Sequence, residues 1–242
     1  MRTIGFIGGI TWESTLEYYR IMNEAVKRKL GGFHSARMIL YSVDFYEIVR
    51  LQQLGDDKRL TEIMVRTSQK LEEAGADFIV IGANTMHRMA DKIEKSVKIP
   101  ILHIADATAE KIKKKGLRKV GLLGTKFTME EEFYRRRLKE RHGIETIIPA
   151  ERDRETVNKI IFKELALGIF KESSRGKYVE IIKRLVDSGA EGVILGCTEI
   201  PLLVKQKHTE VPVFDTTEIH ARAAVDFALK PNVPSSEKPE GV

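Results

Sequence analysis

The sequence of 242 residues has one cysteine, seven prolines and few aromatic residues, which make up 7% of the chain. A single cysteine cannot form a disulfide within the chain, and it fits a reducing compartment, so we expect a cytoplasmic protein. No apolar run approaches the roughly 18 residues needed to cross a membrane, and the start of the chain lacks the pattern of a signal peptide. We therefore expect no membrane partner.

Charge of one sign is not concentrated anywhere, although the formal net charge is +6. The densest basic stretch, residues 111–115, ends a predicted helix just before Gly116. Lysines there interact favourably with the helix dipole, which explains them without a ligand. A nucleic-acid surface would combine basic with aromatic side chains, and aromatic residues are sparse, so we expect no nucleic-acid partner.

The chain contains an internal repeat, seen in three pairs of similar segments that occur in the same order. Residues 2–9 (RTIGFIGG) resemble residues 118–125 (RKVGLLGT), at an offset of 116. Residues 75–84 (GADFIVIGAN) resemble residues 189–198 (GAEGVILGCT), at an offset of 114. Residues 99–102 (IPIL) resemble residues 211–214 (VPVF), at an offset of 112. Nearly equal offsets indicate duplication into two similar lobes.

Short apolar runs and amphipathic segments alternate within each repeat. The apolar runs 4–7, 78–81, 120–123 and 193–195 are typical of strands buried on both faces, and the segments between them have helical spacing. This alternation predicts an α/β fold of two pseudo-symmetric, doubly wound lobes with parallel sheets of about four strands. We expect residues 1–100 and 211–230 to form the first lobe and residues 101–210 the second. Residues 231–242, rich in proline and serine, are expected to form a disordered tail.

Ligands of open parallel sheets bind beyond the carboxyl ends of the strands. Four predicted strand ends carry glycine, mostly followed by small polar residues: 8–10 (GGI), 82–85 (GANT), 124–125 (GT) and 196–199 (GCTE). Backbone N–H groups with Thr and Asn side chains can bind a small carboxylate, although N-capping alone would explain many such residues. The candidate substrate-binding residues are Ile10, Asn84, Thr85, Thr125 and Thr198.

Cys197 is the candidate catalytic residue. A lone cysteine is often an inert buried side chain, but Cys197 follows a buried strand and lies at a predicted helix start. A helix N-terminus lowers the pKa of a thiol, so we expect Cys197 to act as a base. The repeat offset of 114 places Ala83 at the equivalent position of the first lobe.

The glycine-rich start and the segments 83–87 (ANTMH) and 196–199 (GCTE) resemble the aspartate/glutamate racemase superfamily, over residues 1 to about 230. The resemblance is strongest to bacterial L-aspartate/glutamate-specific amino-acid racemases. It implies an active site in the cleft between two lobes and two thiols on opposite faces of the substrate Cα, without pyridoxal phosphate or metal. The expected function is a racemase or epimerase of a small acidic amino acid, Asp, Glu or a broader range. Gln52, which those racemases share, is a further candidate substrate-binding residue, although a surface role is equally open. Glu199 is another candidate and is expected to support the site, because its carboxylate would repel that of a substrate. We also expect a homodimer.

The departure from that family is Ala83, because a methyl group cannot exchange a proton. Either the natural enzyme works with one thiol and takes the second proton from water or a neighbouring hydroxyl, or a native cysteine or threonine has been replaced by engineering. The basic residues that bind the distal carboxylate in some aspartate racemases would fall near Ile48 and Ala166, so that contact is expected to be absent. Two further functions stay open: a one-thiol decarboxylase of a substituted malonate, and a non-catalytic carboxylate-binding protein.

Overall fold

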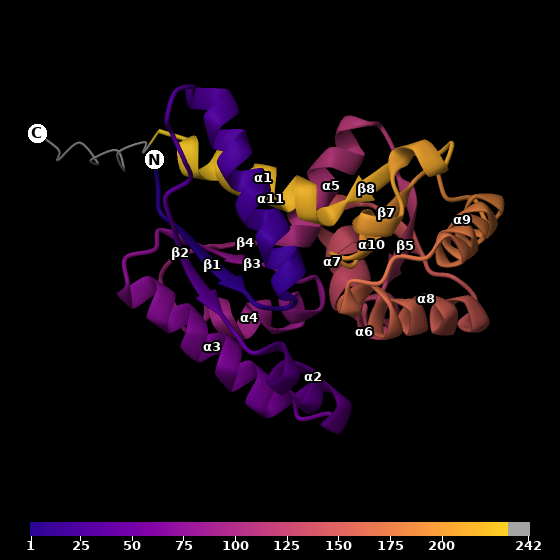
Figure 1. Cartoon of the computed structure of the whole chain (residues 1–242), viewed down its shortest axis with the longest axis horizontal. Coiled ribbons are helices and arrows are strands. Elements are labelled where there is room, and N and C mark those ends of the chain that lie inside the picture. Colours follow the sequence, from indigo (N-terminus) through magenta and orange to yellow (C-terminus); the bar gives the residue numbers. More distant parts are fainter. Residues whose placement is uncertain (232–242) are drawn as a thin grey trace, which may run out of the picture.

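Two parallel four-stranded sheets form the framework of the computed structural model, which describes residues 1–231 (Figure 1). The strand order is β2-β1-β3-β4 in the first sheet and β6-β5-β7-β8 in the second. The two orders are equivalent, which confirms the predicted fold of two similar α/β lobes. Of the expected tail, residues 232–242 lie outside the described residues. Within residues 1–231, no helix is long and apolar enough to span a membrane.

The first sheet is covered by helices on both faces. Leu60 and Met64 of α3 pack on Ile79 from one face, where α2 and α4 also lie. Tyr18 of α1 and Val225 of α11 pack on the other face. The elements of this lobe are β1 (Ile4–Gly8), α1 (Trp12–Leu30), β2 (Met38–Ser42), α2 (Phe45–Leu54), α3 (Asp57–Glu73), β3 (Phe78–Ile81), the 3-10 helix η1 (Thr85–Met89), α4 (Ala90–Glu94), β4 (Ile101–Leu102) and α11 (Thr216–Leu229).

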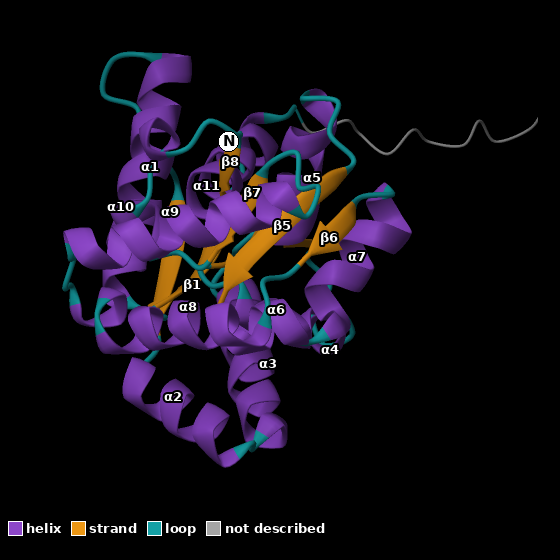
Figure 2. Ribbon diagram, turned by 90° about the vertical axis from the view of Figure 1, so that its right-hand side faces the viewer, coloured by secondary structure: helices purple, strands orange, loops and turns teal. Residues whose placement is uncertain are grey.

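The second sheet has the same layered arrangement, with α8 and α9 on one face and α5 and α7 on the other (Figure 2). Its elements are α5 (Ile104–Lys114), β5 (Lys119–Gly124), α6 (Lys126–Glu130), α7 (Glu132–His142), β6 (Glu145–Ile147), α8 (Glu151–Lys163), η2 (Leu165–Leu167), α9 (Glu172–Asp187), β7 (Val193–Gly196), α10 (Ile200–Leu203), η3 (Gln206–His208) and β8 (Val213–Asp215). The residues of the central strands β5 and β7 are buried on both faces, as their continuous apolar runs predict.

The pairing register reproduces the internal repeat. Gly5 of β1 lies opposite Ile79 of β3. Adding the repeat offsets of 116 and 114 to these residue numbers gives Gly121 and Val193. These two residues also lie opposite each other, in the second sheet. Residues that are equivalent in the sequence repeat are therefore equivalent in the structure, and the equivalence extends to positions 83 and 197.

The chain crosses between the lobes slightly later than the expected boundaries. Residues 101–102 form β4, which pairs with β3 in the first sheet, and residues 213–215 form β8, which pairs with β7 in the second. The prolines that suggested the crossings, Pro100 and Pro212, lie immediately before these strands. The carbonyls of Pro100 and Pro212 accept hydrogen bonds from Ile79 and Val193 N–H at 2.8 and 2.9 Å. Proline is tolerated there because it leads into an edge strand and needs no donor.

Three buried histidines lie where the chain passes between the lobes. The ring of His87 lies 4.5 Å from that of His103 and 5.6 Å from that of His220, between ring centroids. His87 Nε2 accepts from Ile104 N–H at 3.2 Å, so Nδ1 carries the proton and donates to the Ala83 carbonyl at 2.8 Å. His220 joins the Tyr18 hydroxyl to the Leu102 carbonyl, at 2.9 and 2.7 Å. The cluster thus ties the loop at position 83 to the first crossing.

Burial keeps all three rings neutral. It lowers the pKa of His87 to about 3, helped by His220, and it lowers the pKa of His220 to about 4. The pKa of His103 also falls well below its usual range, through burial and the neighbouring His87. A charged imidazole is disfavoured here because water is excluded.

We predict that the protein loses stability between pH 7 and pH 5. The unfolded chain binds protons on these histidines below about pH 6.5, whereas the folded chain does not until a much lower pH. The free energy of unfolding should therefore fall with pH, by about 2 kcal/mol each for His87 and His220 at pH 5. Urea unfolding at several pH values measures the slope. His220→Gln should flatten it and the exposed His34→Gln should not; a slope equal in both variants would contradict the assignment.

Candidate active site

A cavity of about 50 Å³ lies between the two lobes, at the carboxyl ends of the strands. All nine site residues expected from the sequence line it: Ile10, Gln52, Ala83, Asn84, Thr85, Thr125, Cys197, Thr198 and Glu199. Their roles stay predictions, but the structure brings every one of them to the same place. Both lobes contribute, because the ends of β1 and β3 face those of β5 and β7.

The loop after β1 reaches the cavity because of Gly9. This residue has a φ of +84°, and a Cβ there would lie 2.2 Å from the Val43 carbonyl oxygen. Any side chain would therefore push the loop away from the end of β2. The tight contact carries Ile10 and Thr11 to the cavity, and Thr11 then caps α1 by accepting from Ser14 N–H.

The carboxylate of Glu199 binds three donors. Cys197 Sγ lies 2.8 Å from Glu199 Oε2, and Thr198 Oγ1 donates to the same oxygen at 3.0 Å. The hydroxyl of Thr11, from the first lobe, donates to Glu199 Oε1 at 3.0 Å. Glu199 is only 4% exposed, so these bonds replace the water that a carboxylate requires. One buried anion thus holds the thiol and joins the two lobes.

The protonation of Cys197 differs from the expectation. Its pKa is raised, not lowered, because burial and the adjacent Glu199 carboxylate both disfavour a thiolate. The helix that follows is α10, which has only four residues, so its dipole is too weak to compensate. Cys197 is therefore a thiol that donates to Glu199, and a thiolate requires that its proton be taken.

Three hydroxyl groups form a polar cluster across the lobes. Thr85 Oγ1 of the first lobe lies 3.1 Å from both Thr125 Oγ1 and Thr128 Oγ1, which are 3.2 Å apart. Each hydroxyl is a donor and an acceptor and can turn about its C–O bond. Two of these residues, Thr85 and Thr125, line the cavity. Their donors can therefore be redirected towards a carboxylate that enters it.

Asn84 presents an unused acceptor at the cavity. Its Nδ2 donates to Thr216 Oγ1 at 3.0 Å, and that hydroxyl donates to the Leu195 carbonyl at 2.8 Å. These bonds fix the side chain and leave Oδ1 buried without a donor among the described residues. An unpaired buried acceptor costs about 1–3 kcal/mol, which a donor on a ligand would recover. An α-ammonium group is such a donor.

Several lining residues were not expected from the sequence. Most of them are apolar: Phe45, Ile161 and Phe162, with Thr11 beside them. Thr11 could have been found as a helix N-cap next to a strand-end motif. The apolar residues of α2 and α8 carry no local signal, because their position depends on how helices pack. Within residues 1–231 no three His, Cys, Asp or Glu side chains are grouped as metal ligands would be.

We predict that Glu199→Gln lowers the pKa of the Cys197 thiol, because the nearby negative charge is removed. Cys197 is the single cysteine, so the pH dependence of alkylation by iodoacetamide reports on it alone. The exposed Glu180→Gln serves as the matched control and should leave the midpoint in place. An unchanged or higher midpoint in Glu199→Gln would show that this carboxylate does not govern the thiol.

Comparisons with known proteins agree with this fold. The family model of the Asp/Glu/hydantoin racemases matches residues 7–224. The crystal structure of a candidate Asp/Glu racemase from Yersinia pestis is 55% identical, with a TM-score of 0.89, covering 95% of this chain and 100% of that one. An aspartate racemase homologue from Pyrococcus horikoshii OT3 is 42% identical, with a TM-score of 0.82 and the same coverage.

A more distant relative is the broad specificity amino-acid racemase RacX of Bacillus subtilis (strain 168). It is 23% identical over 235 residues, which cover 93% of this chain and 98% of RacX. The family match spans nearly the whole of the two lobes, and it confirms the resemblance carried by the strand-end motifs. The chain belongs to the Asp/Glu/hydantoin racemase family.

Proposed function

We propose that the protein is a cofactor-independent racemase or epimerase that acts at the Cα of an amino acid, with Cys197 as its acid–base residue. One observation carries the proposal. Cys197 and Ala83 are equivalent positions of the internal repeat, and both line the same cavity between the lobes. Such a pair suits a reaction in which a proton leaves one face of a carbon and returns on the other.

The polar groups of the cavity suit the backbone part of an amino acid. In the proposed complex the hydroxyls of Thr85 and Thr125 donate to the α-carboxylate, and Asn84 Oδ1 accepts from the α-ammonium group. When Cα loses its proton, negative charge spreads onto the carboxylate. Hydrogen bonds to those oxygens then strengthen, which lowers the barrier to deprotonation.

In the proposed step, the Cys197 S–H proton passes to Glu199 Oε2, 2.8 Å away, and leaves a thiolate. The thiolate removes the Cα proton, so the S–H bond is restored and a carbanion forms. Protonation from the opposite face completes the inversion. Ala83 cannot supply that proton, so it comes from water in the proposed mechanism. The hydroxide that remains is neutralised by the proton held on Glu199, which restores the carboxylate and the water.

Substrate entry requires the lobes to separate. A cavity needs about 10–15 Å³ to hold one water molecule, so the cavity of about 50 Å³ between the lobes holds only a few water molecules. An amino acid is larger. In the proposed cycle the lobes part to admit the substrate and close over it, which excludes water from the carbanion.

The proposal includes a reducing compartment such as the cytoplasm, where the free thiol of Cys197 is maintained.

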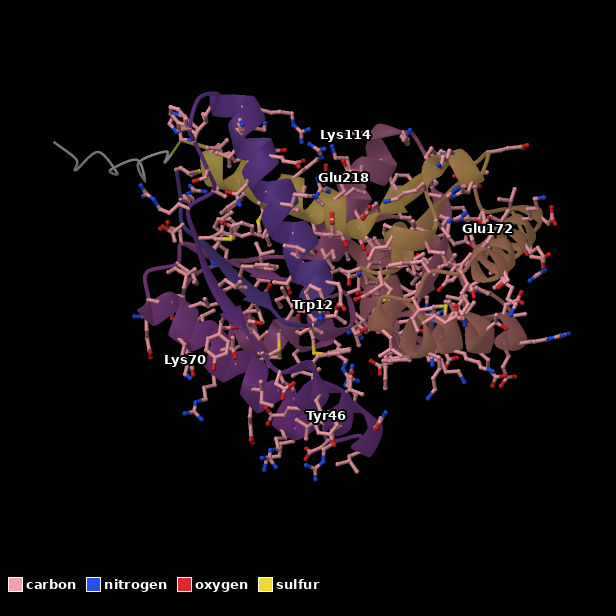
Figure 3. All side chains as sticks on the ribbon, in the orientation of Figure 1. Trp12, Tyr46, Lys70, Lys114, Glu172 and Glu218 are labelled. Carbon is pink, nitrogen blue, oxygen red and sulfur yellow. The ribbon has the colours of Figure 1, made fainter. Side chains whose placement is uncertain are left out.

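The proposal also includes a homodimer. Helix α1 exposes Trp12, Leu16 and Tyr19 by 67, 56 and 51%, and their spacing places them on one helix face. Figure 3 shows Trp12 at the start of this helix, beside the loop that enters the cavity. An apolar face of this kind suits contact with a second copy.

We predict that exchange of the Cα proton in heavy water is fast for one enantiomer and roughly 10²–10⁴-fold slower for the other, because only the Cys197 face has a positioned base. Net racemisation should then be slow even where exchange is fast. Ala83→Cys should raise racemisation sharply, and Ala83→Thr more modestly. The control is Ala150→Cys, which adds a thiol at an exposed position and should change nothing. NMR and chiral chromatography measure the two rates.

Cys197→Ser is the companion variant and should abolish exchange with every amino acid, because a serine hydroxyl is too weak a base at neutral pH. Circular dichroism checks that the variant is folded. Retention of more than about a tenth of the exchange would remove Cys197 from the reaction. Release of CO2 from a substituted malonate, without Cα exchange in any amino acid, would instead favour a one-thiol decarboxylase.

A further inference from the structure

The two ends of the cavity differ in chemistry. The hydroxyl and amide groups lie with Cys197 and Glu199, whereas Phe45, Phe162 and Ala166 form an apolar wall from both lobes. These three residues and Gln52 also line a larger groove of about 790 Å³ between α2, α6 and the end of α8. The groove continues over Val49, Phe127 and Leu167. The cavity therefore has one side that leads outward past apolar side chains, into a groove that polar and charged side chains also line.

No cationic side chain lines the cavity within the part of the chain that the structure describes. The charged lining residue is Glu199, an anion whose oxygens already bind Thr11, Cys197 and Thr198. The α-carboxylate of an amino acid enters with the positive charge of its own α-ammonium group. A side-chain carboxylate has no such counter-charge here and would be strongly disfavoured, because it loses its hydration and is repelled by Glu199. The side chains of Asp and Glu place such a carboxylate one or two methylene groups from Cα.

The cations of this region lie farther out. Lys126 and Lys163 line the groove but not the cavity, and Lys126 is paired with Glu155 at 3.5 Å. Lys126 is thus already paired and Lys163 lies outside the cavity, so neither lysine places a cation beside Cα.

We propose that the substrate is an α-amino acid with an uncharged, extended side chain, which leaves the cavity between Phe45 and Phe162 and continues into the groove. This inference rests on the proposed racemase activity and specifies its substrate class. Glutamine, methionine and norleucine represent the class. Gln52 is the polar residue at the exit and can hydrogen-bond to a polar group on such a side chain. The residues that line the cavity and the groove thus favour a substrate range broader than aspartate and glutamate.

Glutamine and glutamate provide the sharpest comparison, because they have nearly the same shape and differ in charge. Cα–deuterium exchange in heavy water is measured for both enantiomers of Gln, Glu, Met and Asp. The kcat/KM for exchange should be at least about tenfold higher for Gln and Met than for Glu and Asp. Equal or faster exchange of Glu or Asp would overturn this inference and leave the racemase standing. No exchange with any amino acid would overturn both.

Ala166→Lys tests the location of the side-chain site. Ala166 is partly exposed and lines both the cavity and the groove, so a lysine there places a cation on the apolar wall. The ratio of Glu to Gln exchange should rise about tenfold. The matched control is Leu167→Lys, which adds the same charge one residue on, in the groove but outside the cavity. A ratio that stays unchanged in Ala166→Lys, or that rises equally in both variants, would overturn the assignment of this wall.

Discussion

The hydrogen bonds of the Glu199 carboxylate are the interaction on which the site depends. They hold the Cys197 thiol at 2.8 Å and tie it to Thr11 of the other lobe. A buried carboxylate tolerates its lack of water only while these donors stay in place. The same contact raises the pKa of the thiol and supplies an acceptor for its proton. Closure of the lobes and preparation of the thiol are therefore linked through one side chain.

The two lobes have the same fold, but the side chains at equivalent positions of the active site differ. Equivalent strand ends face each other, so positions 83 and 197 lie at related places on the two walls. At one place stand a thiol and its carboxylate. At the other stands a methyl group, whose backbone carbonyl is held by the buried, neutral ring of His87. The first lobe thus keeps an ordered position without an acid or base, which is the basis for expecting unequal treatment of the two enantiomers.

The sequence was sufficient to predict the fold and the strand-end residues, because both follow from local patterns. Apolar runs ending in glycine and polar residues identify strands whose carboxyl ends must converge in a parallel sheet. The sequence did not reveal the apolar wall of Phe45 and Phe162, since these belong to helices whose packing is not encoded locally. The predicted shift in the pKa of Cys197 had the wrong direction, because this pKa depends on burial and on the side-chain position of Glu199. The predicted lobe boundaries fall slightly too early in the chain, because Pro100 and Pro212 lead into edge strands that still belong to the preceding lobe.

The central claim is that Cα of an amino acid lies between Cys197 and Ala83, with its carboxylate on the threonine hydroxyls. A crystal structure with a bound amino acid tests this most directly. The account predicts Cys197 Sγ on one face of Cα and the Ala83 methyl group on the other, with the α-carboxylate contacting Thr85 and Thr125. An amino acid bound with both Cys197 and Ala83 on the same side of Cα, or outside this cavity, would contradict it.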